Sequence, residues 1–294
     1  MLTYQGCNLC PRRCGADRTA GQLGFCRMPA RLTAARAAAH YWEEPLISGS
    51  YGSGTVFFSG CTLRCAFCQN GVISHENYGK ELTSAQLRTV FERLIDDGVQ
   101  NINLVTPTHF LPDILPALTP KLPVPVVYNC GGYESVETLR QLEGLIDIYL
   151  PDMKYSDNRL AKKLSAAPDY FETASAAILE MYRQTGDVVI EDEQMTRGVL
   201  VRHLVLPQEI DNSLGVLDWF AAHFRSGQAL FSLMSQYVPM GSAKKMPPYD
   251  RPITEEEYDA VLSYLMLLDI RDGYTQDFSA ASSEYTPEFD LTGL

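Results

Sequence analysis

Three cysteines follow a short apolar segment of the sequence with a regular spacing. Cys61, Cys65 and Cys68 are separated by three and then by two residues. Thiolates spaced in this way can hold one cubane iron–sulfur cluster. A cluster that only transfers electrons takes four cysteines, whereas three leave one iron open, much as a catalytic zinc keeps an open position. The spacing therefore predicts a four-iron, four-sulfur (4Fe-4S) cluster that binds a further molecule.

Two other interpretations of these cysteines are a zinc knuckle and three reduced thiols in a hydrophobic core. Zinc normally takes four ligands, and core cysteines have no reason to be regularly spaced. With Phe67 directly before the last cysteine, the segment resembles the signature of the radical S-adenosylmethionine (SAM) superfamily. The resemblance implies that the amino and carboxylate groups of SAM bind the open iron. It also implies that one electron from the cluster cleaves SAM to a 5′-deoxyadenosyl radical.

A second group of cysteines lies near the N-terminus, at Cys7, Cys10, Cys14 and Cys26. Glycines between them let a short chain fold tightly enough for four sulfurs to converge. The spacing predicts a metal-binding module and linker over residues 1–50, and chance buried thiols are the alternative. Four thiolates can hold structural zinc, a single iron of the rubredoxin type or an auxiliary iron–sulfur cluster. The spacing therefore does not identify the metal. A structural role and electron relay are equally compatible with this pattern.

The composition excludes several classes of protein. The chain of 294 residues is 46% hydrophobic and 20% charged, as expected of a globular protein with one sizeable core. No apolar run reaches the roughly 18 residues of a membrane span, and no apolar signal segment precedes the first cysteine. The net charge of −12 argues against binding to nucleic acid or to anionic membranes. Eight cysteines without an export signal predict reduced thiols and a cytoplasmic location.

Residues 1–36 carry six arginines and only one acidic residue, Asp17. Such a run of charge is usually a solvated face of the protein. A second interpretation is a docking surface for an acidic electron donor, such as a flavodoxin or a ferredoxin, with contacts from Arg12 and Arg13.

Strand-like and helix-like segments alternate along the rest of the chain. The predicted strands cover residues 55–59, 101–105, 124–129, 146–150, 199–206 and 229–236. The predicted helices cover residues 83–98, 135–145, 170–184, 218–224 and 254–268, with capping boxes at Thr83/Gln86 and Thr254/Glu257. Residues 30–39 predict a short helix or linker, residues 49–54 a flexible turn, and residues 188–197 an acidic excursion.

Six strand-then-helix units predict a parallel sheet with right-handed crossovers, covered by helices. Six units are too few for a closed eight-stranded barrel. We therefore expect an α/β fold, a partial (β/α)6 barrel similar to a TIM barrel, over residues 51–275. A tail over residues 276–294 follows, which either covers the open edge of the barrel or mediates contacts. Such folds place their chemistry at the C-terminal ends of the strands.

Polar or unusual side chains follow the predicted strands. A zwitterionic cofactor needs hydrogen bonds for its ammonium group, countercharge for its carboxylate, and contacts to its ribose and adenine. The residues after the strands offer all three. They are Thr106, Thr108, His109, Asn129, Cys130, Asp152, Lys154, Arg202, His203, Gln236 and Tyr237.

These strand ends, together with the N-terminal cysteines, carry a closer resemblance. The chain is similar from Cys7 to about Asp290 to the PflX-like proteins, relatives of the pyruvate formate-lyase activating enzymes. The resemblance is specific for the family and says little about the substrate. The motifs that carry it are Leu9-Cys10-Pro11-Arg12 with Cys14-Gly15, residues 104–109, residues 149–155, residues 202–207 and Gln236-Tyr237.

The resemblance implies roles for several of these residues. The activating enzymes have an Asp-x-Lys motif near the cofactor carboxylate, which matches Asp152 and Lys154, with an exposed ion pair as the alternative. Their arginine on the fifth strand, which contacts the cofactor, matches Arg202. If Arg202 points into the barrel, alternation along the strand turns His203 outward as a structural residue. The polar residue after the third strand matches Asn129.

The same resemblance places either Gln236 or Tyr237 near the adenosine. The sequence departs from the activating enzymes after the second strand, where they carry Gly-Gly-Glu to receive the amino group of SAM. This chain has Thr106 and Thr108 there, whose hydroxyl groups can accept the same ammonium. The neighbouring His109 is either a contact to substrate or cofactor or a packing residue.

Cys130 is either a hydrogen-atom donor that faces the radical or a small buried residue. No single residue is assigned as catalytic from the sequence, because the cofactor carries the chemistry and the protein mainly orients it.

Taken together, the residues predict a radical SAM oxidoreductase that abstracts hydrogen from a substrate over the mouth of the barrel. The substrate is either a glycine of a protein, which makes this a glycyl-radical-enzyme activase, or another peptide or small molecule. The missing Gly-Gly-Glu and the extra N-terminal module weaken the first choice. The hypothesis from a different functional class is a non-catalytic protein. It is either an iron–sulfur electron carrier or an interaction protein stabilised by a bound metal.

Overall fold

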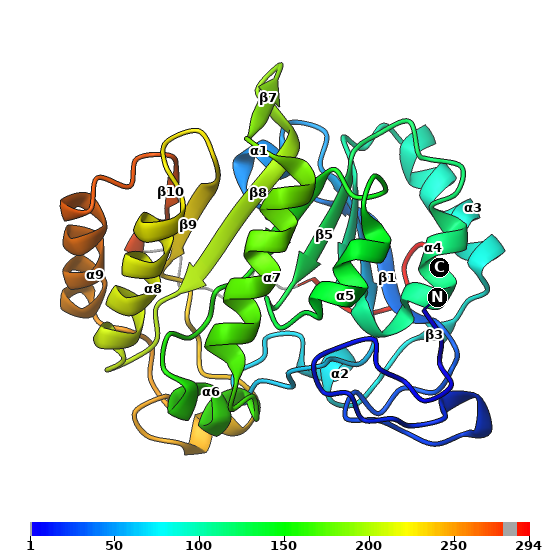
Figure 1. The fold of residues 1–294 in the computed structure, drawn as a ribbon, viewed down its shortest axis with the longest axis horizontal. Coiled ribbons are helices and arrows are strands. Elements are labelled where there is room, and N and C mark those ends of the chain that lie inside the picture. The colour runs from blue at the N-terminus through cyan, green and yellow to red at the C-terminus, as the bar shows by residue number, and fades with distance from the viewer. Residues whose placement is uncertain (1, 279–286) are drawn as a thin grey trace.

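The computed structural model describes residues 2–278 and 287–294. Within these residues ten strands form one sheet in the order β10-β9-β8-β6-β5-β4-β2-β1-β3, with β7 paired to β8. The strands from β2 to β10 along this order run parallel. Figure 1 shows the sheet curved, with helices on its outer face. The predicted open barrel of strand-then-helix units is confirmed.

The elements have the following bounds. The strands are β1 (Thr33–His40), β2 (Ser53–Phe58), β3 (Lys80–Glu81), β4 (Ile102–Val105), β5 (Val126–Cys130), β6 (Ile148–Pro151), β7 (Val189–Glu191), β8 (Gln194–Leu204), β9 (Leu230–Met234) and β10 (Gly273–Thr275). The α-helices are α1 (Pro45–Ser48), α2 (Gly71–Ser74), α3 (Ser84–Asp96), α4 (Leu111–Ala117), α5 (Val136–Leu139), α6 (Asn158–Ser165), α7 (Tyr170–Thr185), α8 (Ile210–His223) and α9 (Glu255–Leu267). The short 3-10 helices are η1 (Arg18–Ala20), η2 (Thr108–Phe110), η3 (Arg140–Leu142) and η4 (Gly241–Lys245).

The six predicted strands are β2, β4, β5, β6, β8 and β9. Every residue of β5, β6 and β9 is buried, which explains why these strands read as continuous apolar runs. The strand β8 begins at Gln194, earlier than predicted, because it first forms a hairpin with β7. The turn of this hairpin holds Asp192 and Glu193 at φ angles of 48° and 64°. The predicted acidic excursion is therefore a β-hairpin.

The helices begin where their capping signals predict. In α3 the Thr83 hydroxyl oxygen accepts a hydrogen bond from the Gln86 backbone amide. The Gln86 side-chain oxygen in turn accepts one from the Thr83 backbone amide. The pair Thr254 and Glu257 does the same for α9. Each box satisfies two amide groups that the first helical turn leaves without partners. By contrast, α5 is much shorter than predicted and α8 is longer.

Residues 30–39 were predicted as a short helix or linker, and this prediction is wrong. The segment forms β1, which pairs antiparallel with β2 and with β3. Alanine favours a helix in isolation, but Ala34, Ala35 and Ala37 are almost completely buried in the sheet. Pairing with two strands and burial outweigh the intrinsic preference. The sheet therefore begins at Thr33, inside the segment assigned to the N-terminal module, and the three-part division of the chain stays a prediction.

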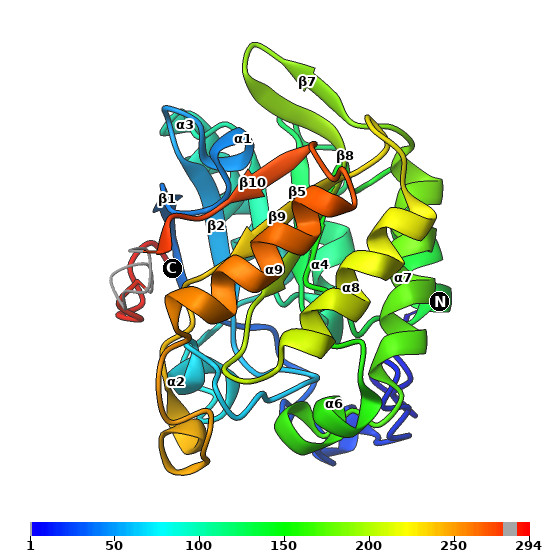
Figure 2. The ribbon, with the colours of Figure 1, turned by 90° about the vertical axis from the view of Figure 1, so that its left-hand side faces the viewer.

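The chain between β1 and β2 folds back into the barrel. It forms α1, which contacts β8. Ile47 of α1 is fully buried with Ile148 and Leu230, the first residues of β6 and β9, and with Leu200, which pairs with Leu230. Figure 2 shows α1 at this end of the sheet, close to β10. The segment thus fills the end of the barrel opposite to the predicted site.

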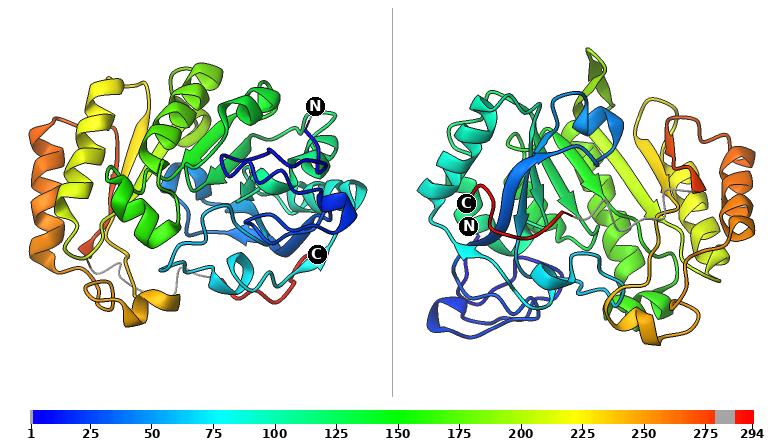
Figure 3. Two further views of the ribbon diagram at one scale, coloured as in Figure 1. Left: turned by 60° about the horizontal axis from the view of Figure 1, so that its bottom comes forward. Right: turned by 180° about the vertical axis from the view of Figure 1, so that it is seen from behind.

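The N-terminal module, residues 2–32, contains one 3-10 helix and packs below the sheet, near α2 (Figure 3). Its Arg18 is only 1% exposed. The guanidinium group donates to the carbonyl oxygens of Met28 (2.9 Å), Pro29 (2.7 Å) and His109 (2.6 Å). The predicted solvated face of arginines is therefore wrong for this residue, because its hydrogen bonds join the module to the barrel.

Arg12 is likewise held by the barrel. It donates to the carbonyl oxygens of Thr62 (2.9 Å) and Ser165 (3.0 Å), and also to that of Ala166. Its guanidinium lies 3.8 Å from the centre of the Phe25 ring. These contacts leave Arg12 anchored beside the Cys61–Cys65 loop rather than free on the surface.

The end of the chain, residues 287–294, runs along β1. The Ala37 amide donates to Thr292, the Leu291 amide donates to Ala35, and Arg36 forms an ion pair with Asp290. These contacts cover part of the outer edge of β1. Residues 279–286 of the predicted tail lie outside the described residues. None of the described helices is long and apolar enough to cross a membrane.

Candidate functional site

The cysteine loop leaves the sheet at the end of β2. Gly60 turns the chain with a φ angle of 82°, and a Cβ atom there would lie 2.3 Å from Met28. Only glycine tolerates both the conformation and this approach. The turn directs the following loop across the C-terminal ends of the strands, as predicted.

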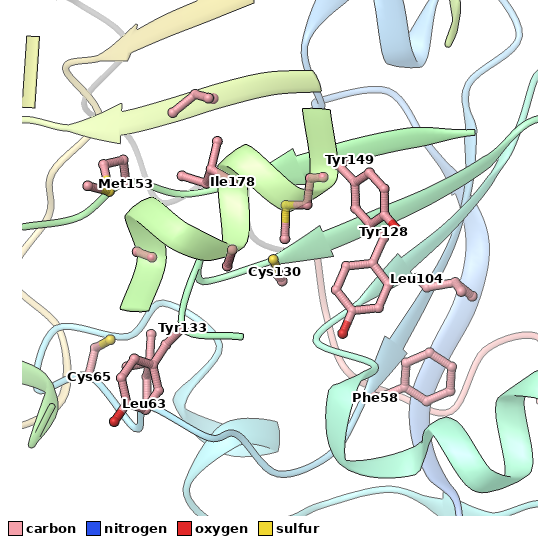
Figure 4. Packing of buried hydrophobic residues seen from close by; sticks show 14 of the residues in the cluster. Phe58, Leu63, Cys65, Leu104, Tyr128, Cys130, Tyr133, Tyr149, Met153 and Ile178 are labelled. Atoms are coloured by element: carbon pink, nitrogen blue, oxygen red, sulfur yellow. The ribbon is translucent and has the colours of Figure 1, made fainter. Parts of the chain in front are cut away.

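Cys61, Cys65 and Cys68 line one cavity of about 240 Å³. Figure 4 shows Cys65 beside Leu63 and Tyr133, at the edge of the buried core. Each of the three sulfurs accepts a hydrogen bond, and such bonds tune the charge and reduction potential of a thiolate-bound cluster. The donors are the Leu63 amide to Cys61 (3.3 Å), the Ser165 hydroxyl to Cys65 (2.9 Å) and the Ser74 hydroxyl to Cys68 (3.2 Å).

A charged network forms the facing wall of this cavity. Asp152, after β6, accepts from Lys154 Nζ at 2.5 Å and from Arg202 Nε at 2.9 Å. Burial alone raises the pKa of Asp152, but Arg202 and Lys154 outweigh it and lower the pKa. Burial likewise acts against the charge of Lys154, yet Asp152 raises the pKa of that amine. The site therefore holds a buried carboxylate and two cations in their charged states.

Asn129, at the end of β5, belongs to the same network. Its side-chain oxygen accepts from Arg202 Nη2 at 2.7 Å. The structure thus brings together four residues that the sequence predicted as SAM contacts: Asn129, Asp152, Lys154 and Arg202.

Glu43 completes this network, and the sequence analysis missed it. It precedes α1, and its carboxylate accepts from Arg202 Nη1 (3.0 Å), Asn129 Nδ2 (3.0 Å) and Asn103 Nδ2 (3.3 Å). Its side chain is only 9% exposed. The one signal in the sequence was that Glu43 and Glu44 interrupt a stretch otherwise poor in acidic residues.

The two acidic and two basic side chains of this network give the cavity a wall without net charge. The side chains of Asp152, Lys154 and Arg202 are all less than one-fifth exposed. Paired charges of this kind can separate to receive the carboxylate and the ammonium of a zwitterion. The wall therefore suits the methionyl end of SAM.

Four further predicted residues also line the cavity: Thr106, Cys130, Gln236 and Tyr237. Thr106 follows β4 with a φ angle of 58°, which is strained for a β-branched residue. The Tyr237 ring lies 5.8 Å from that of Phe67, and its hydroxyl group donates to the Tyr249 carbonyl at 2.7 Å.

Thr108 and His109 lie behind the wall rather than in the cavity. The Thr108 hydroxyl donates to the buried Glu134 at 2.8 Å. His109 is 1% exposed, and its Nε2 lies 2.7 Å from the Ser59 carbonyl oxygen. Burial lowers the pKa of His109 to about 3, so the ring is neutral. This placement fits the packing role weighed for His109, and Thr108, which is buried, does not line the cavity.

His203 points away from the cavity, as alternation along β8 predicts. It is fully buried, with Nδ1 2.6 Å from the Met153 carbonyl oxygen and Nε2 2.9 Å from the Ser213 hydroxyl. Both ring nitrogens are satisfied, which is the structural role expected for this residue.

The N-terminal cysteines are gathered in one small module. The Gly15 amide donates to the Cys7 carbonyl at 3.1 Å, and a Cβ atom at Gly24 would lie 2.5 Å from Cys14 Sγ. All eight cysteines are free thiols. Among the described residues, no three His, Cys, Asp or Glu side chains converge as ligands of a single metal ion. The three cysteines of the Cys61 loop do not converge on a single ion either. The cofactor expected there is a cluster, whose ligands bind different iron atoms.

Comparison with known families decides the identity of this site. Residues 55–216 match the model of the "Radical SAM superfamily". The chain belongs to the radical SAM superfamily. The match covers the chain from β2 to α8, including the cysteine loop and Asp152, Lys154 and Arg202, while Glu43 lies before it. The protein is therefore a radical SAM enzyme, which implies a 4Fe-4S cluster and SAM as its cofactors.

The chain is also similar to individual proteins. The chain is 29% identical over 270 residues to an uncharacterized protein of Methanocaldococcus jannaschii, covering 88% of this chain and 74% of that protein. The structure resembles Streptococcus suis SuiB bound to SAM, with a TM-score of 0.51 and 13% identity over 75% of this chain and 49% of that chain. It also resembles methylornithine synthase (PylB), with a TM-score of 0.48 and 14% identity over 73% and 68% of the two chains. The likeness to SuiB shows the fold alone, and this chain spans about half the length of that protein.

The hydrogen bond from Ser165 to Cys65 predicts an effect on the reduction potential. The hydrogen bond from Ser165 to the Cys65 thiolate stabilises the reduced cluster, because the reduced cluster carries more negative charge. In Ser165→Ala this stabilisation is lost. A loss of about 1 kcal/mol corresponds to a shift of about 40 mV to more negative potential for one electron. Redox titration followed by electron paramagnetic resonance measures the shift. Ser175→Ala, whose hydroxyl group has no hydrogen-bond partner, is the matched control and keeps the wild-type potential. An unchanged potential in Ser165→Ala contradicts the assigned role.

Removing the charge of Glu43 is expected to weaken the binding of SAM. In Glu43→Gln, Arg202 and Asn129 lose a shared charged acceptor and are no longer held in one geometry. The expected loss of affinity is roughly tenfold, the scale of one hydrogen bond to a charged group. Isothermal titration of SAM into the anaerobic reconstituted protein measures it. Glu92→Gln, which removes an exposed ion pair on α3, serves as the control, and equal affinities in the two variants refute the assignment.

Proposed function

We propose that this protein is a cytoplasmic oxidoreductase that abstracts a hydrogen atom from a bound substrate after reductive cleavage of SAM. The observation that carries the proposal is that three thiols and a paired-charge wall line one cavity. The three sulfurs would hold the cluster, and the facing charges would hold the amino acid part of SAM. When bound, the cluster and SAM together supply one electron and a 5′-deoxyadenosyl radical.

The protein's own residues then have distinct tasks. Lys154 and Arg202 favour the carboxylate of SAM because they are the buried cations of the cavity wall. The carboxylates of Asp152 and Glu43 favour the ammonium group and keep both cations charged. Thr106, at its strained turn, offers a further acceptor in place of the glutamate that the activating enzymes use there.

The adenosine end of SAM fits the other side of the cavity. Gln236 and Tyr237 follow β9 and line the cavity with Phe67. The Tyr237 ring is almost completely buried, and its hydroxyl group is already satisfied by the Tyr249 carbonyl oxygen. It therefore supplies an apolar face for adenine rather than a hydrogen bond.

Two substrate classes follow from the resemblance to the PflX-like proteins. One is a glycine of a partner protein, which makes the enzyme a glycyl-radical-enzyme activase. The other is a different peptide or a small molecule. The turn at Thr106 and the N-terminal module separate this chain from the activating enzymes, so the second class has the stronger support. A flavodoxin or ferredoxin is the expected electron donor.

The exposed arginines of the N-terminal module are the candidates for contact with that donor. Arg13 and Arg31 are about two-thirds exposed and form only surface ion pairs, with Glu137 and Glu81. Such pairs contribute little stability and can be exchanged for contacts with an acidic partner.

The cleavage reaction itself is tested on reconstituted protein. Incubation with SAM and dithionite under anaerobic conditions is expected to form 5′-deoxyadenosine, and Cys65→Ala is expected to form none, because the cluster loses a ligand. Liquid chromatography measures the product. Absence of product from protein with a verified cluster, or unchanged product in Cys65→Ala, refutes the proposal and favours a non-catalytic iron–sulfur protein.

We propose in addition that Cys7, Cys10, Cys14 and Cys26 hold a second metal centre. In a Cys61/Cys65/Cys68 triple alanine variant, elemental analysis is expected to find residual metal. Zinc alone indicates a structural site, iron without sulfide a rubredoxin-type site, and iron with sulfide an auxiliary cluster. Alanine at the four N-terminal cysteines should remove that metal and leave the main cluster. Metal-free triple variant protein contradicts a second centre.

A further inference from the structure

A second and larger cavity adjoins the cofactor cavity. Its volume is about 1010 Å³, which is large enough for a small molecule or a peptide segment. It lies between the segment that carries α1 and the strand β10, close together in Figure 2. The two cavities are continuous with each other, because they share five lining residues. These are Trp42, Glu43, Arg202, Met234 and Gln236.

The lining of the larger cavity is strongly acidic. Arg202 is the one cation among the described residues that line it, and that guanidinium is bound to Asp152, Glu43 and Asn129. The cavity therefore has an excess of negative charge. The carboxylates that line it are Glu43, Glu44, Asp192, Glu193 and Asp277.

Glu44 is a buried carboxylate of this cavity that lies near Arg202 without forming an ion pair with it. Its residue is only 8% exposed, and within the described part of the chain it forms no ion pair. Buried carboxylates are normally paired, because an isolated buried charge is costly. Its neighbour Glu43, by contrast, lies 3.0 Å from Arg202. Beside Glu44 lies the fully buried hydroxyl group of Ser232, which interacts with the Glu44 carboxylate. Among the described residues Glu44 thus has a neutral neighbour, Ser232, but forms no ion pair with a cation.

Aromatic rings complete the chemistry of this cavity. Tyr41 and Trp42 line it and are 56% and 63% exposed. The faces of such rings attract cations. Carboxylates and aromatic rings together are the environment that binds an ammonium group.

We propose that the larger cavity is the substrate site, and that it selects a substrate with an alkylammonium group, which Glu44 receives. The proposal rests on the hydrogen abstraction proposed above. Glu43, the neighbour of Glu44, lies in the wall that the two cavities share. With its ammonium group bound at Glu44, the substrate therefore has its carbon chain beside the cofactor cavity. A free amine and a lysine side chain share this chemistry.

The test compares two peptides that differ only in charge. The probes are N-acetyl-Gly-Lys-Gly-amide and the same peptide with norleucine in place of lysine, titrated into the reconstituted protein and followed by saturation-transfer NMR. The lysine peptide is expected to bind about tenfold more tightly. In Glu44→Gln this preference should disappear, and in Glu44→Asp it should remain in part. Glu81→Gln, a surface variant outside the cavity, should keep the full preference.

n-Butylamine, added as a competitor, separates the two sources of the ammonium group. Displacement of the lysine peptide by n-butylamine supports an ammonium site open to free amines, and a lysine preference without displacement supports a site for peptides. Equal binding of both peptides to the wild-type protein, or a lysine preference that persists in a folded Glu44→Gln protein, overturns the proposal.

Formation of 5′-deoxyadenosine is measured on the same samples. If it persists while the preference for lysine is absent, only the substrate class is refuted. If 5′-deoxyadenosine itself is absent from the wild-type protein, the proposed reaction fails instead. The two failures are therefore distinguishable.

Discussion

The buried guanidinium of Arg202 is the interaction on which the rest of the site depends. A charge in the interior costs several kcal/mol unless hydrogen bonds and opposite charge satisfy it. Arg202, on β8, finds these partners in Asp152 after β6, Asn129 on β5 and Glu43 before α1. Because all three contacts must form together, they hold three strand ends and one loop in a single arrangement. These contacts align the side chains that line the cofactor cavity.

A second constraint joins the N-terminal module to the cysteine loop. Arg12 donates to Thr62, inside the loop, and to Ser165, whose hydroxyl group in turn donates to Cys65. Arg18 fixes the same module against the carbonyl oxygen of His109, behind the wall of the cavity. The module thus supports the geometry around the cluster ligands through backbone contacts, whichever metal its own cysteines hold.

Features with a local cause were predicted well. The capping boxes at Thr83 and Thr254 act within one helical turn, and the spacing of Cys61, Cys65 and Cys68 is set within one loop. The strand β1 was missed because alanine favours a helix until pairing with other strands overrides that preference. Thr108 was placed in the site from its position after a strand, but a 3-10 helix turns it toward Glu134 instead.

The sequence by itself predicted the cysteine loop and the order of the strand-then-helix units from local spacing and patterning, and it pointed to Asp152 and Lys154 through the family resemblance. Only the tertiary structure decided that Glu43 meets Arg202 across 159 residues of chain, and that Glu44 is buried with no ion pair among the described residues. No local pattern encodes such contacts, since they exist only once α1 has folded back into the barrel and the strand ends have converged. The cysteine loop indicates the family, whereas the proposed chemistry of the substrate rests on the packing around Glu44.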